Sequence, residues 1–212
     1  MPTAQSVIDD VRTDVLMDPD KIRWSDAELL RGLNAARREV ATVRPSAFTT
    51  TVAHALVAGP RQTIPTTAVA LVKAYRNTSG RAVRLVPEEQ LNSLDPDWLL
   101  ETPSATVENY THDPREPRAF FVYPPAKLPA SLDLVVAVAP TDVALGDPLG
   151  MDDLYVNAVK HFIVHRAFMK DSEFAGPDAR AVAAYQAFET AMGLRAQADA
   201  AQAPPAATEG SA

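Results

Sequence analysis

The chain has 212 residues, which suits one or two domains, and 47% of them are hydrophobic, enough for a core without a metal or disulfide. Twenty Lys and Arg residues stand against 27 Asp and Glu residues, so the formal charge of -7 argues against a protein that neutralises many phosphates. Cysteine is absent, which excludes disulfides, zinc–thiolate sites and thiol catalysis.

The N-terminal stretch MPTAQSVIDDVRTDV lacks the basic and apolar regions of a signal peptide. No apolar run in the sequence approaches membrane-spanning length. We therefore expect a protein that is made and kept inside a cell, with no membrane among its partners.

Residues 1–45 are predicted to form a helical hairpin. Thr3 is a candidate N-cap of the first helix. Ser25, followed three residues later by Glu28, forms a capping box at the start of the second helix. Pro45 disfavours its continuation, because the residue before a proline is biased away from helical geometry.

Residues 46–150 are predicted to form a β-rich, mostly antiparallel insertion. Short β-branched or alternating runs such as AVALVKAYRN, RAFFVYPP and SLDLVVAVAP are separated by turn residues. Gly80 lies between two such runs and is expected to take a positive φ in a hairpin loop. Pro124 and Pro125 are expected to end the strand that begins at Arg118.

Helical spacing returns in residues 151–197, which predicts two further helices. Residues 198–212 are rich in Ala and Pro and are expected to be a disordered tail. The predicted fold is therefore α+β. An antiparallel bundle of two N-terminal and two C-terminal helices, from residues 1–45 and 151–197, would form one domain that carries the β-rich insertion.

The sequence contains no motif for nucleotide binding or nucleophilic catalysis. No pair of glycines forms a GxGxxG or GxxxxGK loop, and there is no GxSxG elbow. We therefore expect no catalytic residues, no cofactor-binding residues and no cofactor.

The best metal candidate is the pair His161 and His165, which share a helical face. Phe162 stands where the zincin pattern needs a glutamate, and no third ligand is evident. We favour histidines bonded to a carbonyl or carboxylate at the edge of a buried helix, and predict no metal.

A set of arginines and aromatic residues is the candidate interface. Three arginines bracket the loop at Gly80, two lie in the stretch YTHDPREPRAFFVYPP, and the aromatic residues after them alternate along a strand. We interpret HDPREP as a rigid corner that aims this strand, rather than as an acid–base centre. The candidate interface residues are Arg76, Arg81, Arg84, Arg115, Arg118, Phe121 and Tyr123.

Several segments together carry a family resemblance across residues 7–194. They are IRWSDAELLRGLNAARREVATVRP, YRNTSGRAVRLVPEEQLNSLDPDW, HDPREPRAFFVYPP, and VNAVKHFIVHRAFMKDSEFAG with its follower AAYQAF. In order and spacing they resemble the head-to-tail adaptor proteins, or head-tail connectors, of tailed bacteriophages. The organisation is similar to that of the tail tubular protein A adaptors of short-tailed phages.

The resemblance implies a non-enzymatic virion protein at the head-tail junction, made in the host cytoplasm. Such a protein assembles with itself into a ring, commonly of twelve copies, beneath the portal protein. It joins the portal to the downstream tail or nozzle protein and surrounds the channel for genomic DNA, without sequence-specific binding. The resemblance implies no membrane partner.

Two other functional classes stay open from the residues alone. The first is a small metal- or carboxylate-dependent hydrolase, for example one acting on cell wall, which the histidine pair and adjacent carboxylates would serve. The second is a regulatory or DNA-binding module that would use the arginines around Gly80.

Overall fold

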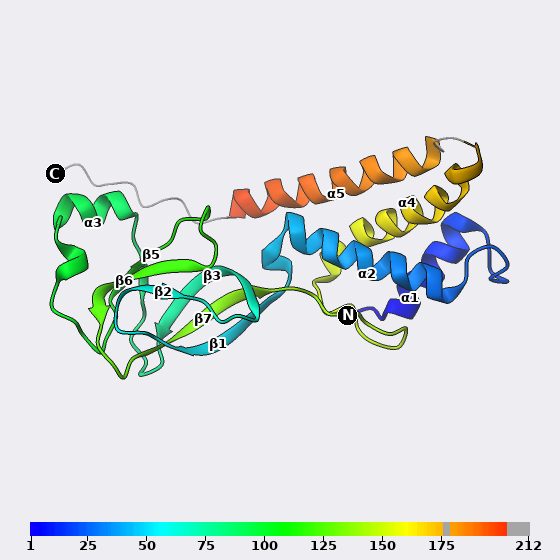
Figure 1. The fold of residues 1–212 in the computed structure, drawn as a ribbon. Coiled ribbons are helices and arrows are strands. Elements are labelled where there is room, and N and C mark those ends of the chain that lie inside the picture. The colour runs from blue at the N-terminus through cyan, green and yellow to red at the C-terminus, as the bar shows by residue number, and fades with distance from the viewer. Residues whose placement is uncertain (176–178, 203–212) are drawn as a thin grey trace. The chain divides into compact units, whose positions relative to one another are not determined.

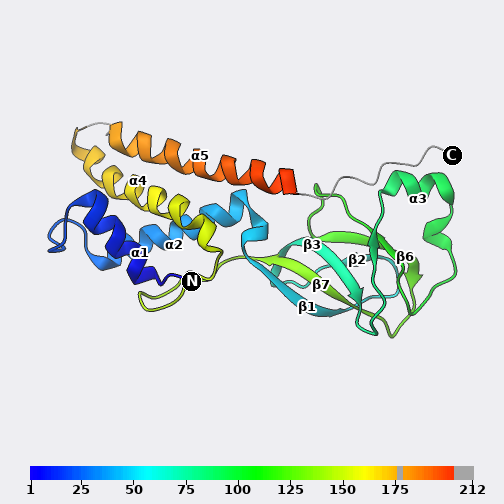
Figure 2. The same ribbon diagram turned by 180° about the vertical axis from the view of Figure 1, so that it is seen from behind.

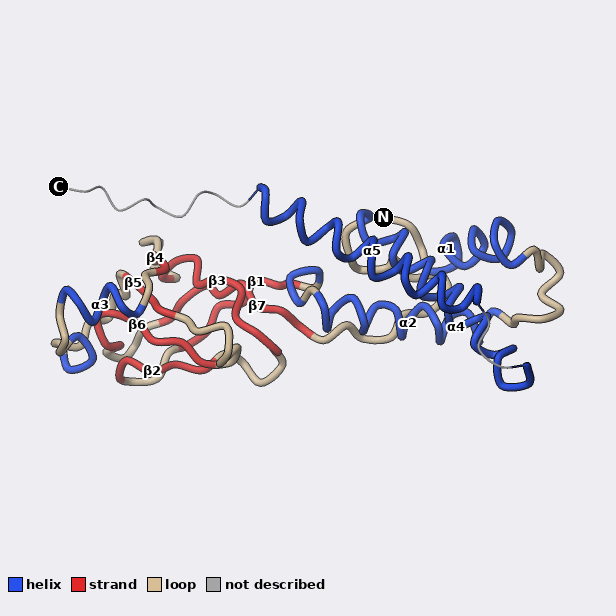
Figure 3. The backbone as a smooth tube through the Cα atoms, turned by 90° about the horizontal axis from the view of Figure 1, so that it is seen from above, coloured by secondary structure: helices blue, strands red, loops and turns tan. Residues whose placement is uncertain are grey.

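The computed structural model describes residues 1–175 and 179–202 (Figure 1). The chain divides into two compact units, one of Met1–Val43 with Thr141–Ala212 and one of Arg44–Pro140. Among the described residues, the strands all lie in the second unit, as the colouring of Figure 3 makes visible.

The first unit is helical. Thr3 caps α1 (Ala4–Val11), and a π-helical turn, η1 (Arg12–Leu16), follows it. The Oγ of Thr3 accepts a hydrogen bond from the backbone N–H of Ser6 at 3.2 Å, which confirms the predicted N-cap. The later elements are α2 (Asp26–Val43), the 3-10 turn η4 (Asp153–Tyr155), α4 (Val156–Ala175) and α5 (Ala179–Gln202).

The helices of this unit pack around α4, which contacts α1, α2 and α5 (Figure 2). Buried aliphatic and aromatic side chains such as Leu33, Ile163 and Phe188 fill the space between them. Helix α5 continues to Gln202, past the expected end of the helical region at residue 197. The remainder of the expected tail, residues 203–212, lies outside the described residues.

The second unit contains two sheets. The first has the order β1-β7-β3 and is antiparallel, and the second has the order β2-β6-β5-β4, in which β4 and β5 pair in parallel. The strands are β1 (Thr49–Ala55), β2 (Gly59–Thr63), β3 (Ala68–Asn77), β4 (Arg84–Leu85), β5 (Asn109–Thr111), β6 (Ala119–Ala126) and β7 (Ser131–Val138). The other elements are η2 (Pro45–Ala47), α3 (Glu88–Leu94) and η3 (Trp98–Leu100).

One apolar cluster joins the facing sides of the two sheets. It contains Leu71 from β3 and Leu134 from β7 together with Phe120 and Val122 from β6. Because side chains alternate along a strand, Phe121 and Tyr123 lie on the opposite face of β6. The α+β class predicted from the sequence is confirmed.

Strand β6 includes both prolines that were expected to end it, so that prediction is wrong. A proline has no N–H to donate but keeps its carbonyl. The carbonyl of Pro125 accepts a hydrogen bond from the backbone N–H of Ser104 at 2.9 Å, and Ala126 still pairs with Gly59 of β2. Pairing therefore continues through the prolines.

Candidate protein interface

The predicted arginines do not form one patch. Arg76 on β3 donates from its Nε to Oδ2 of Asp133 on β7 at 2.7 Å. Arg81 lies 3.0 Å from Oε1 of Glu108 and shares a shallow recess with Arg84. Arg76 and Arg81 are therefore paired within the β-rich unit, and Arg84 has no ion pair with any described residue.

The other two predicted arginines belong to the HDPREP corner. Arg115 donates from its Nε to both carboxylate oxygens of Asp113, at 3.1 and 3.0 Å, and this contact lowers the pKa of Asp113. His112 donates from Nδ1 to the carbonyl of Ala119 at 3.0 Å. The backbone N–H of Glu116 closes the turn on the carbonyl of Asp113. These bonds make the stretch a corner. Arg118, which follows the corner, is exposed and has no ion pair with a described residue.

The aromatic residues of the candidate interface contact a tryptophan of their own chain. Phe121 and Tyr123 both meet Trp98 of η3 edge to face, with ring centroids 6.2 and 6.5 Å apart. Trp98 is only 2% exposed, and its indole N–H donates to Oδ1 of Asn92 at 2.8 Å. These rings therefore hold residues 88–101 against the sheet.

A groove of about 490 Å³ runs between α2 and α4 in the helical unit. A Cβ at Gly32 would lie 3.8 Å from the Cβ of Arg166, so the two helices approach closely at this glycine. The lining consists of Trp24, Glu28, Leu29, Arg31, Gly32, Ile163, Arg166, Ala167, Met169 and Lys170, which we call the α2–α4 groove.

The α2–α4 groove combines an apolar floor with positive charge. Leu29 and Ile163 are buried beneath it. Its cations are Arg31, Arg166 and Lys170, and its one carboxylate is Glu28, which leaves a net charge of +2 on a chain of charge -7. Arg31 and Arg166 form no ion pair with any described residue.

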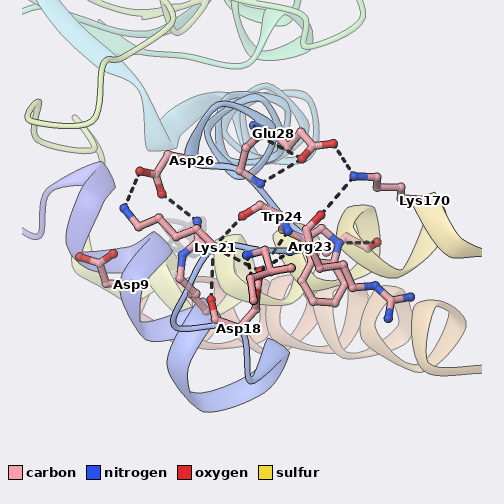
Figure 4. Close-up of polar contacts among 12 residues, drawn as sticks. Asp9, Asp18, Lys21, Arg23, Trp24, Asp26, Glu28 and Lys170 are labelled. Carbon is pink, nitrogen blue, oxygen red and sulfur yellow. Dashed lines mark hydrogen bonds and ion pairs between the residues drawn. The ribbon is translucent and has the colours of Figure 1, made fainter.

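Residues 17–25, which we call the clamped loop, precede α2 and place Trp24 at one end of the groove lining. Figure 4 shows the polar contacts that hold this loop. The carboxylate of Asp18 accepts backbone hydrogen bonds from Ile22 at 2.9 Å, Arg23 at 3.1 Å and Trp24 at 3.0 Å. The hydrogen bond from the Trp24 N–H, together with those from Ile22 and Arg23, lowers the pKa of Asp18, because these bonds favour the charged carboxylate. The loop therefore has one defined conformation.

Arg12 ties the clamped loop to the helices. Its guanidinium is nearly fully buried and lies 3.6 Å from Oδ2 of Asp18. Nη1 donates to the carbonyl of Trp24 at 2.6 Å, and Nη2 donates to Oδ1 of Asp26 at 2.7 Å. Lys21 also contacts Asp26, at 2.7 Å, and lowers the pKa of that carboxyl group.

Glu28 joins α2 to α4 at the same end of the groove. Its carboxylate accepts hydrogen bonds from the N–H and hydroxyl of Ser25, which confirms the predicted capping box. Lys170 donates to the other oxygen at 2.7 Å. This hydrogen bond, together with the two from Ser25, lowers the pKa of Glu28 to about 2. Lys170 also reaches the carbonyl of Arg23 at 3.2 Å.

The sequence interpretation missed the α2–α4 groove. Arg166 and Lys170 are four residues apart and therefore share a helical face, which was the available signal. Nothing in the pattern indicated that α2 would place Arg31 beside them.

His165 donates from Nδ1 to the carbonyl of Ala181 at 2.9 Å, as expected of a histidine at a helix edge. In residues 1–175 and 179–202 there is no group of three or more His, Cys, Asp or Glu residues placed to hold a metal ion. Within the same ranges, no helix has the length and apolar character needed to cross a membrane.

Comparison with known families gives a match over nearly the whole chain. A family model described as SU10 adaptor protein matches residues 2–208, which include both units. No curated protein matches the sequence. The match confirms the resemblance to head-to-tail adaptors.

Proposed function

This chain belongs to the SU10 adaptor protein family, and we propose that it joins the phage portal to the tail as a homo-oligomeric ring around the DNA channel. It is a structural adaptor of a bacteriophage. The observation that carries the proposal is the family match over residues 2–208, since it spans the helical and the β-rich unit alike.

The proposed partners are further copies of the chain, the portal protein and a downstream tail or nozzle protein. Genomic DNA would pass through the ring without sequence-specific contacts, and the chain's negative charge supports weak retention of DNA. We propose no catalytic role, cofactor or metal for the protein.

We propose a different role for each of the two units. We assign residues 1–45 and 151–197 to a helical domain, an antiparallel bundle that builds ring contacts. Residues 46–150 form a β-rich domain that contacts a neighbouring subunit or the tail. A closed ring needs two different patches on each subunit, because its contacts are heterologous.

The seven predicted interface residues enter this proposal unequally. Arg84 and Arg118 are exposed and remain direct contact residues. Phe121 and Tyr123 contribute by holding Trp98 in place. Arg76, Arg81 and Arg115 keep their exposed surfaces but have acidic partners within the chain.

The virion provides the direct test of location. An epitope tag on the N-terminus of the protein should be found by electron microscopy at the head-tail junction of assembled particles. Tagged protein that is absent from purified particles, or found only on the capsid or the tail tip, would contradict the proposed function.

A further inference from the structure

The α2–α4 groove has a chemical counterpart on the same chain. Residues 88–101, from α3 through η3, have the sequence EEQLNSLDPDWLLE, which contains five carboxylates and no Lys or Arg. We call this segment the acidic knob. Its formal charge is -5, against -7 for the whole chain.

The acidic knob also exposes large apolar side chains. Leu94 is 76% exposed, Leu99 41% and Leu100 83%. Several leucines within one short acidic segment form a patch of the kind that marks a protein–protein contact. Glu88, Glu89, Asp97 and Glu101 are exposed and have no ion pair with any described residue.

The knob is ordered before any partner arrives. Trp98 is buried in its base against Phe121 and Tyr123, and Asn92 accepts its indole N–H. The backbone N–H of Asp95 bonds to the carbonyl of Leu91 at 2.9 Å and ends α3. A rigid knob loses little conformational entropy on docking, which favours affinity.

The groove is ordered in the same way. Glu28 and Lys170 fix its wall, and the clamped loop fixes Trp24 at its end. Arg31 and Arg166, which have no ion pair with a described residue, line the groove together with its apolar floor. An occupant must therefore supply both carboxylates and aliphatic side chains.

We propose that the acidic knob of one copy docks in the α2–α4 groove of a second copy. The leucines of the knob would cover the apolar floor, and its carboxylates would face Arg31 and Arg166. Knob and groove are different patches, so the contact is heterologous and repeats from copy to copy. The proposal rests on the proposed ring and names a contact that builds it.

Charge reversal on each side tests the contact. The knob variant is Asp97→Arg with Glu101→Arg, and the groove variant is Arg31→Glu with Arg166→Glu. Like charges then oppose one another in assemblies of either variant alone, and the concentration for half-maximal assembly on portal rings should rise at least about tenfold.

Mixing the two variants should restore assembly. The reversed knob of one variant fits the reversed groove of the other, and the unreversed knob and groove also match, so alternating copies form every contact. Only a contact between copies gives this rescue. Mass photometry with portal rings measures the assembled mass, and circular dichroism checks the folding of each variant.

A matched control reverses exposed charges outside both surfaces, Asp20→Arg with Lys73→Glu, and should assemble with the wild-type concentration dependence. If the knob and groove variants also assemble like wild type, this inference is wrong while the proposed function stands. If only the groove variant fails and mixing does not rescue it, the groove binds an acidic segment of another protein, which also overturns the inference. Wild-type protein that does not assemble on portal rings contradicts the proposed function itself.

Discussion

Asp18→Ala should destabilise the helical unit through the clamped loop. The substitution removes the acceptor of three backbone N–H groups, from Ile22, Arg23 and Trp24. It also removes a carboxylate 3.6 Å from the guanidinium of Arg12, whose side chain is only 3% exposed. Leaving a buried charge and a buried N–H without this partner costs about 3 kcal/mol. For a chain of this size, the melting temperature should fall by roughly 10 °C.

The two tryptophans allow each unit to be followed separately, because Trp24 lies in the helical unit and Trp98 in the β-rich unit. In a Trp98→Phe background, the fluorescence transition of Trp24 in urea should shift to lower concentration on Asp18→Ala. In a Trp24→Phe background, the Trp98 transition should not shift. Asp20→Ala is the matched control, since this exposed carboxylate is in the same loop and its loss should change stability by less than about 0.5 kcal/mol. Equal effects of the two alanine substitutions would refute the assigned role of Asp18.

Three further outcomes follow from particular contacts. Because the pKa of Glu28 falls from 4.5 to about 2, its bonds stabilise the fold above pH 4.5 and are lost as the pH falls towards 2. The urea stability of wild type should therefore exceed that of Glu28→Gln by about 1–2 kcal/mol at pH 6, after allowing for solvent screening, and the difference should vanish near pH 2. Gly32→Ala should raise thermal stability by about 0.5–1 kcal/mol, because its Cβ would meet only ordinary contacts; a lower melting temperature would show that α2 and α4 are too close. Asn77→Asp should cost about 2–4 kcal/mol in the Trp98 transition, because the buried amide donates to two backbone carbonyls at 3.0 and 2.8 Å; an unchanged midpoint would contradict this.

Local signals in the sequence predicted several elements well. Thr3 and the Ser25–Glu28 pair cap the helices that they were expected to cap. Gly80 has a φ of 116° in the loop after β3. Each depends on residues within a few positions of one another, so the sequence contains all the necessary information.

The division into two sheets was not predictable in the same way. Strands β4 and β5 contain two and three residues, too few for alternation to be recognised. Their parallel pairing depends on the path of residues 86–108 between them. The prolines of β6 were expected to end the strand. The hydrogen bond that the carbonyl of Pro125 accepts comes from Ser104, in a segment that no local pattern places beside it.

The candidate surfaces show the same limit. The α2–α4 groove brings Arg31 beside Arg166, and only the tertiary packing of two helices distant in sequence creates it. The role of Asp18 was not predicted from the sequence. Its carboxylate accepts three backbone hydrogen bonds because the loop folds back around it. No rule of residue spacing indicates this fold of the loop.

The most direct test of the adaptor function is the mass of the purified protein mixed with portal rings of the same phage. Mass photometry should show the portal peak move to a higher mass that corresponds to a ring of bound copies. Protein that stays monomeric beside unchanged portal rings, at concentrations well above those in an infected cell, would contradict the proposed function.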